Sequence, residues 1–145
     1  MVSEGGLRKP EREAIKIDDS KFWNEKELDA ELRRQFDVCH SCRRCFNLCD
    51  SFPKLFDLID DAPSMELDTV ETSSFKNVID ACTLCDMCFM VSCPYVPPHE
   101  FAIDIPSIFI RYKALENKKK SDLLGSQIAK TDLNGRIGVF FSATA

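Results

Sequence analysis

The sequence has few glycines, no long apolar run and no excess of basic residues. Its 5 glycines leave few positions for tight hairpin turns, and no segment alternates apolar and polar residues as a half-buried strand does. No window of about 18 apolar residues occurs, which excludes a transmembrane helix. With 19 Lys and Arg against 24 Asp and Glu, the net charge of −5 disfavours a nucleic-acid-binding surface. These absences favour an all-α fold. They also argue against a nucleic-acid partner.

The first residues also lack the apolar core of a secretory signal. Residues 2–13 carry charged side chains throughout, at Glu4, Arg8, Lys9, Glu11, Arg12 and Glu13. We therefore expect no export and a cytoplasmic location. Any association with the inner face of a membrane would be peripheral and made through a partner.

Cysteine is abundant by contrast, and all 8 cysteines stand in two runs. The first run is Cys39, Cys42, Cys45 and Cys49, and the second run is Cys82, Cys85, Cys88 and Cys93. A disulfide framework needs an oxidising compartment, which the missing signal argues against. Two interpretations remain, namely structural zinc and iron-sulfur clusters.

The spacing favours iron-sulfur clusters. Zinc sites with four cysteines are typically built from two separated Cys-x2-Cys pairs. Here CHSCRRCFNLC reads Cys-x2-Cys-x2-Cys-x3-Cys, and CTLCDMCFMVSCP reads Cys-x2-Cys-x2-Cys-x4-Cys-Pro. Three thiolates at steps of three residues can reach three corners of a 4Fe-4S cube, and the fourth corner faces away. In two-cluster proteins the fourth cysteine of each run binds the other cluster.

Two 4Fe-4S clusters are therefore predicted, and each takes ligands from both runs. The ligands of the first are Cys39, Cys42, Cys45 and Cys93, and those of the second are Cys82, Cys85, Cys88 and Cys49. The runs depart from the bacterial ferredoxin pattern because Asp50 follows Cys49 where proline is usual, and because four residues precede Cys93. These departures change the loop geometry and leave the number of ligands unchanged. A structural zinc-binding interaction module is the alternative.

Apolar spacing predicts helices on both sides of each run. Residues 1–23 are charged and mixed, which indicates a flexible N-terminal arm, and residues 24–117 form the predicted domain. An amphipathic helix leads from Asn24 into the first run, with apolar residues at Leu28, Leu32 and Phe36. A helical hairpin between the runs would bring them together, with apolar positions at Leu55, Phe56, Ile59, Phe75, Val78 and Ile79.

A further helix is predicted to begin at Pro106 and to end near Lys118–Lys120, whose positive charges suit a helix C-terminus. Residues 118–145 are predicted to form a helical tail. Its last apolar residues have no cap, so we expect the tail to be the start of a downstream region of a longer protein.

The predicted clusters point to electron transfer. An iron-sulfur cube with four thiolates has no open iron for a substrate, so its natural work is the transfer of single electrons. Gly135 and Gly138 give only a GxxG, and no glycine-rich phosphate loop follows a strand. Binding of flavin or NAD is therefore not supported, and the chain is expected to be a component of an oxidoreductase complex rather than a catalyst by itself.

The segments CHSCRRCFNLCDSFPKLFDLID and ACTLCDMCFMVSCPYVPPHEFAIDIP carry a family resemblance. They resemble the N-terminal iron-sulfur domain of the C subunit of anaerobic glycerol-3-phosphate dehydrogenase and of related iron-sulfur oxidoreductases. More distantly, they are similar to the heterodisulfide reductase C subunit, the glycolate oxidase iron-sulfur subunit and the C-terminal domain of the succinate dehydrogenase iron-sulfur subunit. The resemblance covers about residues 24–115.

The resemblance implies an α-helical ferredoxin domain whose cluster ligands are the eight cysteines named above. It also implies partners, namely a flavoprotein dehydrogenase or other redox subunit as the electron donor and membrane quinone or another redox acceptor. Members of this family usually continue into repeats with a Cys-Cys-Gly signature, whereas this sequence ends at Ala145.

Overall fold

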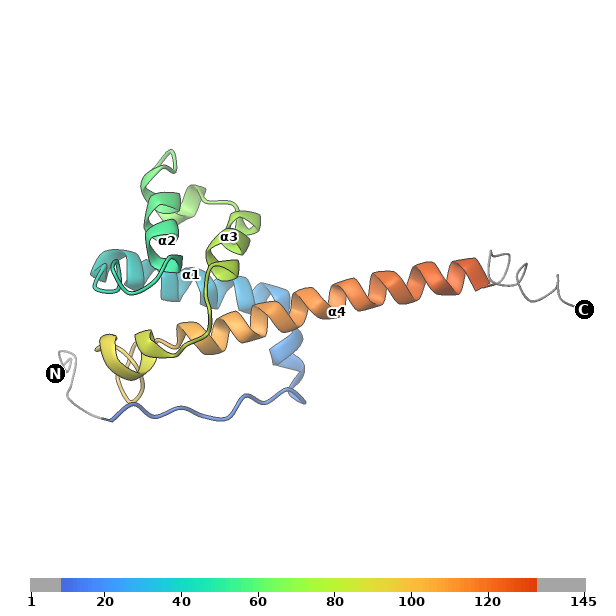
Figure 1. The fold of residues 1–145 in the computed structure, drawn as a ribbon, viewed down its shortest axis with the longest axis horizontal. Coiled ribbons are helices and arrows are strands. Elements are labelled where there is room, and N and C mark those ends of the chain that lie inside the picture. The colour runs from blue at the N-terminus through green and yellow to red at the C-terminus, as the bar shows by residue number, and fades with distance from the viewer. Residues whose placement is uncertain (1–8, 133–145) are drawn as a thin grey trace, which may run out of the picture. The chain divides into compact units, whose positions relative to one another are not determined.

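A computed structural model describes residues 9–132, with side chains described up to residue 123. Throughout the described residues the regular structure is helical and contains no strand, which confirms the all-α prediction (Figure 1). The chain divides into two compact units, Met1–Arg111 and Tyr112–Ala145. The fate of the predicted tail beyond residue 132 lies outside the described residues.

Helix α1 spans Glu25–Cys42 and begins where the sequence predicted. The Asn24 side chain accepts hydrogen bonds from the backbone N–H groups of Lys26 and Glu27, which satisfies donors that a helix start otherwise leaves unpaired. Its buried face includes Leu28, Leu32 and Phe36. The helix extends further than predicted, because its last turn contains Cys39 and Cys42 of the first run.

Helices α2 (Ser51–Asp60) and α3 (Phe75–Asp80) form the predicted hairpin between the runs. They pack against each other, and the Ser51 hydroxyl donates to the Val78 carbonyl across the contact at 2.8 Å (Figure 1). Ser74 precedes α3, but its side chain makes no capping hydrogen bond. The hairpin places the end of the first run and the start of the second run at the same end of the helix pair.

The core of the first unit is aromatic. Phe36 of α1 is fully buried and makes edge-to-face contacts with Phe75, at a centroid distance of 5.1 Å, and with Phe109, at 5.9 Å. The connection between α2 and α3 contains two short 3-10 helices, η2 (Leu67–Thr69) and η3 (Thr72–Ser74). Arg33 of α1 holds this connection by donating to the carbonyls of Leu67 at 2.8 Å and Val70 at 3.0 Å.

Helix α4 spans Ile105–Asp132. Its start agrees with the prediction, since Pro106 occupies the first turn, where the missing N–H of proline costs nothing. The predicted end near Lys118–Lys120 is wrong, because the helix continues through these lysines to Asp132. Lysine is a good helix former, and no proline or glycine follows before Gly125, so the local sequence gives the helix no reason to stop.

The segment before α1 lies against the first unit. It contains a 3-10 helix, η1 (Ser20–Trp23), and the Glu11 backbone N–H donates to the Pro97 carbonyl at 2.9 Å. Arg111 donates to the carbonyls of Phe22, at 2.7 Å, and of Lys21. Residues 9–23 of the predicted arm therefore make several contacts with the body of the protein.

Candidate metal centre

The cysteines of the two runs line two pockets. The first pocket is partly open to solvent. It is lined by Cys39 and Cys42 from the last turn of α1, by Cys45 from the following turn, and by Cys93 from the end of the second run. Three of its thiols therefore come from one run and the fourth from the other.

The second pocket has the complementary composition. Its cysteines are Cys82 and Cys85 in the irregular segment after α3, Cys88 at the start of the π-helix η4 (Cys88–Ser92), and Cys49 from the first run. The two pockets thus divide the eight cysteines into the same two sets of four as the sequence assignment. That these sets bind metal stays a prediction.

The remaining walls of the pockets are mainly apolar. The first pocket is lined by Val38, Phe52, Phe56, Pro94, Tyr95 and Ile103, and by one charged residue, Arg44. The second pocket is lined by Leu48, Phe52, Ile105 and Pro106, and by Ser51, Thr83 and Asp86. The buried side chain of Phe52 borders both, so the pockets are immediate neighbours.

Burial and mutual proximity keep the thiols of Cys39, Cys45 and Cys88 protonated near neutral pH. Burial is the main cause that raises the pKa of Cys45 to about 11 and that of Cys88 to about 12, and neighbouring thiolates raise both further. The pKa of Cys39 is raised well above its ordinary value for the same reasons, and Cys88 of the other pocket is among its neighbours. A cation that binds here must displace protons, and thiolates at these positions need its positive charge.

Backbone donors point at two of the sulfurs. The Leu84 N–H donates to Cys82 Sγ, and the Tyr95 N–H donates to Cys93 Sγ, both at 3.4 Å. Such bonds favour the thiolate form and influence the reduction potential of a cluster bound through the sulfur. Each pocket therefore has at least one backbone donor on a cysteine contributed by the second run.

Three non-glycine residues within the runs have left-handed backbone conformations. They are Arg43 with φ of 50°, Leu84 with φ of 57° and Asp86 with φ of 62°. Such conformations are costly without glycine, and they persist where the surroundings impose them. Here they turn the chain sharply between successive cysteines, which lets consecutive thiols face one pocket.

Ion pairs connect each cysteine loop to a charged side chain outside the run. Arg43 donates to Asp60 at the end of α2, with Nη1 2.9 Å from Oδ2, and His40 Nε2 lies 2.9 Å from Oδ1 of the same carboxylate. Arg12 holds the second loop by donating to both oxygens of Asp86, at 2.9 and 3.0 Å. This pairing keeps the pKa of Asp86 below its ordinary value.

The partners Arg12, Asp60 and Asp104 were not singled out from the sequence. Arg12 lies in the stretch interpreted as an arm, and it is separated from Asp86 by 74 residues and from Asp104 by 92. Pairs so distant leave no local signal such as a shared helix face. Within the cysteine loops, by contrast, the regular spacing alone identified the candidate ligands.

Each pocket gathers four thiols, which is the number of ligands that a 4Fe-4S cluster takes. Among residues 9–123, no group of three or more His, Cys, Asp or Glu side chains is placed to hold one metal ion. A cubane binds each thiolate at a different iron, so it needs cysteines spread around a cavity, and both pockets offer this arrangement. The set of four thiols with apolar walls also suits iron-sulfur chemistry.

No protein-family model, no curated protein and no solved structure matches this chain. No helix within the described residues has the length and apolar character needed to cross a membrane.

Proposed function

We propose that this chain is an electron-transfer protein or subunit that holds two 4Fe-4S clusters in an α-helical ferredoxin domain. The observation that carries the proposal is the pair of neighbouring pockets, each lined by three cysteines of one run and one of the other. This exchange of the fourth cysteine is the arrangement that two-cluster ferredoxins use.

The cysteines would hold the first cluster through Cys39, Cys42, Cys45 and Cys93, and the second through Cys82, Cys85, Cys88 and Cys49. When bound, such clusters supply one-electron redox chemistry. Four thiols per cluster leave no iron open to a substrate, so we assign electron relay rather than catalysis to the chain. The apolar walls, Phe52 above all, exclude water from the space between the pockets.

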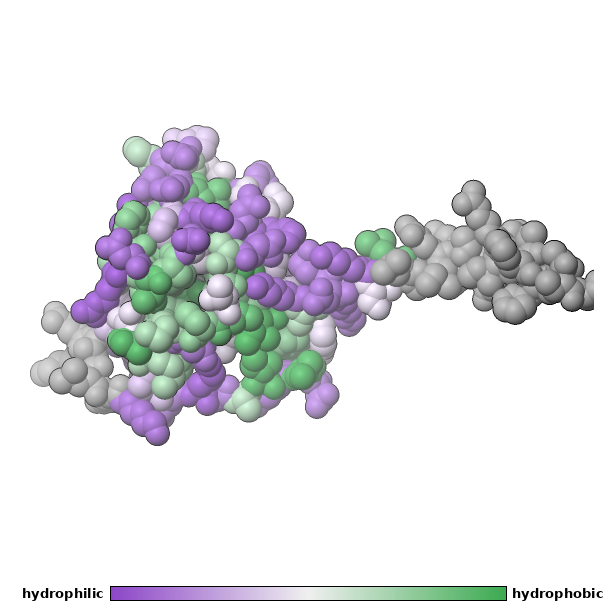
Figure 2. Space-filling model, viewed as in Figure 1, coloured by the Kyte–Doolittle hydropathy of each residue, from purple (hydrophilic) through white to green (hydrophobic). Residues whose placement is uncertain are grey.

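A redox partner would dock at the surface over the second run. Met87, Met90 and Val91 follow the exposed Cys85 closely in sequence and are 46%, 55% and 71% exposed. Figure 2 shows apolar side chains reaching the surface among polar ones on one face of the protein. Exposed methionines suit adaptable contacts with a partner.

We propose a flavoprotein dehydrogenase or another redox subunit as the donor, and quinone or another redox group as the acceptor. The flavoprotein would perform the two-electron chemistry for which this sequence offers no site, and the two clusters would pass the electrons on singly. Contact with a membrane would then be made through the partner, with the chain on its cytoplasmic side.

Metal analysis of protein purified without oxygen tests the proposal. About eight irons and about eight sulfides per chain are expected, with an EPR signal that appears on reduction. A variant with Cys85→Ser serves as a control, since it should lose part of the iron and sulfide and keep the helical circular dichroism. Zinc without sulfide would overturn the proposal in favour of a structural zinc-binding module.

A further inference from the structure

The first two cysteines of the second run lack the helical support that the first two cysteines of the first run have. Cys39 and Cys42 belong to the last turn of α1, whereas Cys82 and Cys85 lie in residues 82–86, which have no regular secondary structure. Asp86, between Cys85 and Cys88, has a left-handed φ of 62°. Leu84 in the same segment also has a left-handed φ, of 57°, which a leucine rarely adopts, so contacts from outside the loop must hold this conformation.

Arg12 provides three contacts that hold the loop. Its guanidinium donates to both oxygens of Asp86 at 2.9 and 3.0 Å, and to both oxygens of Asp104 at 2.6 and 2.9 Å. It also lies over the ring of Phe89 in η4, 3.9 Å from the centroid. Paired hydrogen bonds of this kind use the planar fork of arginine, which a lysine ammonium cannot reproduce.

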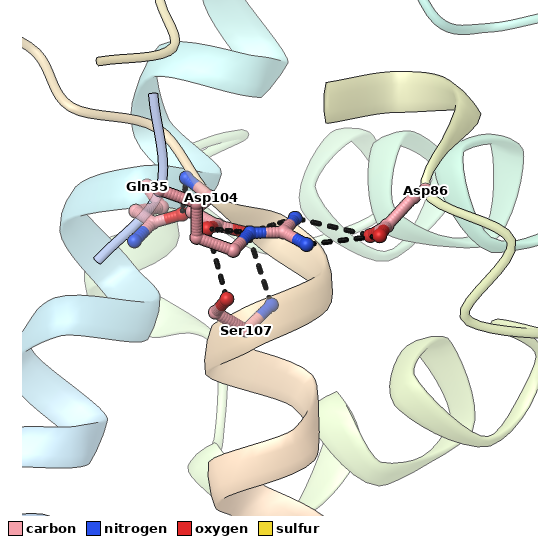
Figure 3. Close-up of polar contacts among 5 residues, drawn as sticks. Gln35, Asp86, Asp104 and Ser107 are labelled. Atoms are coloured by element: carbon pink, nitrogen blue, oxygen red, sulfur yellow. Dashed lines mark hydrogen bonds and ion pairs between the residues drawn. The ribbon is translucent and has the colours of Figure 1, made fainter. Parts of the chain in front are cut away.

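Asp104 connects this contact to the rigid part of the unit. Its side chain accepts hydrogen bonds from the backbone N–H of Ser107, at 3.0 Å, and from the Ser107 hydroxyl, at 2.8 Å, in the first turn of α4. The Asp104 N–H donates to Gln35 of α1, which is only 4% exposed. Figure 3 shows Asp86 facing this cluster of Gln35, Asp104 and Ser107 across the gap that the guanidinium bridges.

We propose that Arg12 is a positioning residue for the second cluster: it clamps the Cys85–Cys88 loop to Asp104 and balances the negative charge of Asp86 beside the second pocket. The inference rests on the proposed function as far as the cluster is concerned. It makes the segment before α1 a part of the second site, although this segment is remote from the second run in sequence.

The positive charge of Arg12 also affects the addition of an electron to the second cluster. Asp86 lines the second pocket, and a cluster with four thiolates adds further negative charge there. Loss of the guanidinium would leave two carboxylates, Asp86 and Asp104, without their shared cation. Addition of an electron to the second cluster would then be less favourable, whereas the first cluster, beside Arg44, would be little affected.

Three variants and a matched control test the clamp. Arg12→Ala removes the contact, Arg12→Lys keeps the charge without the fork, and Asp86→Asn removes the negative charge from the loop. Lys16→Ala is the control, because Lys16 also lies in the N-terminal segment but pairs with the exposed Glu13, at 3.8 Å. Hydrogen exchange over residues 83–92 in the protein as purified and redox titration of both clusters are the two measurements.

In Arg12→Ala we expect exchange in residues 83–92 to accelerate by about tenfold or more, while exchange near the first run stays unchanged. One of the two midpoint potentials should become more negative. Asp86→Asn should release the loop similarly but move the same midpoint potential in the opposite direction. Arg12→Lys should bring the midpoint potential closer to that of the unmodified protein than it brings the hydrogen exchange of residues 83–92. Opposite shifts from two variants that both loosen the loop separate the electrostatic role from a structural one.

Unchanged exchange in Arg12→Ala, or equal shifts of both potentials, would overturn the clamp. If the purified protein contains no iron or sulfide, the proposed function fails by itself. The exchange measurement in that same protein still decides whether Arg12 holds the loop.

Discussion

Arg43 and Asp86 occupy equivalent places in the two runs, each directly after the second cysteine, and both have a left-handed φ, of 50° and 62°. The two loops therefore turn in the same way, but they carry opposite charges. Each charge is paired from outside its loop, Arg43 by Asp60 and Asp86 by Arg12. The repeated backbone geometry matches the repeated spacing, while the charges distinguish one pocket from the other.

The pairing of Arg43 with Asp60 predicts a pH dependence. Hydrogen bonds from Arg43 and then His40 lower the pKa of Asp60 from 3.8 to about 2. Because the folded-state pKa is lowered, this pairing stabilises the fold fully above the ordinary pKa, and the contribution is lost as the pH falls through about 2.

Carboxyl NMR should accordingly show Asp60 still ionised at pH values where an ordinary aspartate is already protonated. In Arg43→Ala the midpoint should rise toward 3.8. Arg44→Ala is the control, since Arg44 makes no hydrogen bond to Asp60 among those the structure describes. An Asp60 midpoint that does not respond to Arg43→Ala would contradict the pairing.

The division of cysteines between pockets predicts a crossed pattern of loss. Cys93→Ser should disturb the cluster of the first run, and Cys49→Ser should disturb the cluster of the second run, because each lines the pocket of the opposite run. EPR of the reduced protein should show a different surviving signal in each variant. The signal that remains in Cys93→Ser should be missing or altered in Cys49→Ser. If Cys93→Ser instead resembled Cys82→Ser, the cysteines would be grouped by run and the assignment would be wrong.

Arg44 should raise the reduction potential of the first cluster, because it lines the first pocket. In Arg44→Ala we expect that potential to fall by tens of millivolts, on the order expected for an exposed charge interaction of about 1 kcal/mol. Lys54→Ala is a matched control, since Lys54 lines the groove beside α2 and α3 and neither cysteine pocket. Equal shifts in both variants would indicate an effect of net charge only.

The aromatic core should dominate stability. Phe36→Ala removes a fully buried ring that contacts Phe75 and Phe109, and we expect a loss of about 3–5 kcal/mol in the free energy of unfolding. Denaturant unfolding followed by circular dichroism measures it. Ile17→Ala, at a residue that is 57% exposed, should change stability far less, and similar losses in both variants would contradict the assigned core.

Features that depend on local spacing could be predicted from the sequence. The apolar period of Leu28, Leu32 and Phe36 gave α1, and the cysteine steps gave the two sets of four that the pockets bring together. Features that depend on distant contacts could not be predicted. The Arg12 contact with Asp86 joins residues with no shared periodicity. The predicted end of α4 was wrong because the positive charge near Lys118 suits a helix C-terminus, while lysine is also a good helix former and lets the helix continue.

The crossing of ligands between the runs also affects how the protein would be assembled. Groups bound in the two pockets would join Cys45 to Cys93 and Cys49 to Cys82, so that one closed loop of chain lies inside another. Cross-links of this kind restrict the unfolded chain and leave the halves connected after a cut within residues 61–73. During synthesis, neither site has its four thiols until the second run has emerged, so the proposed clusters would be inserted after that point.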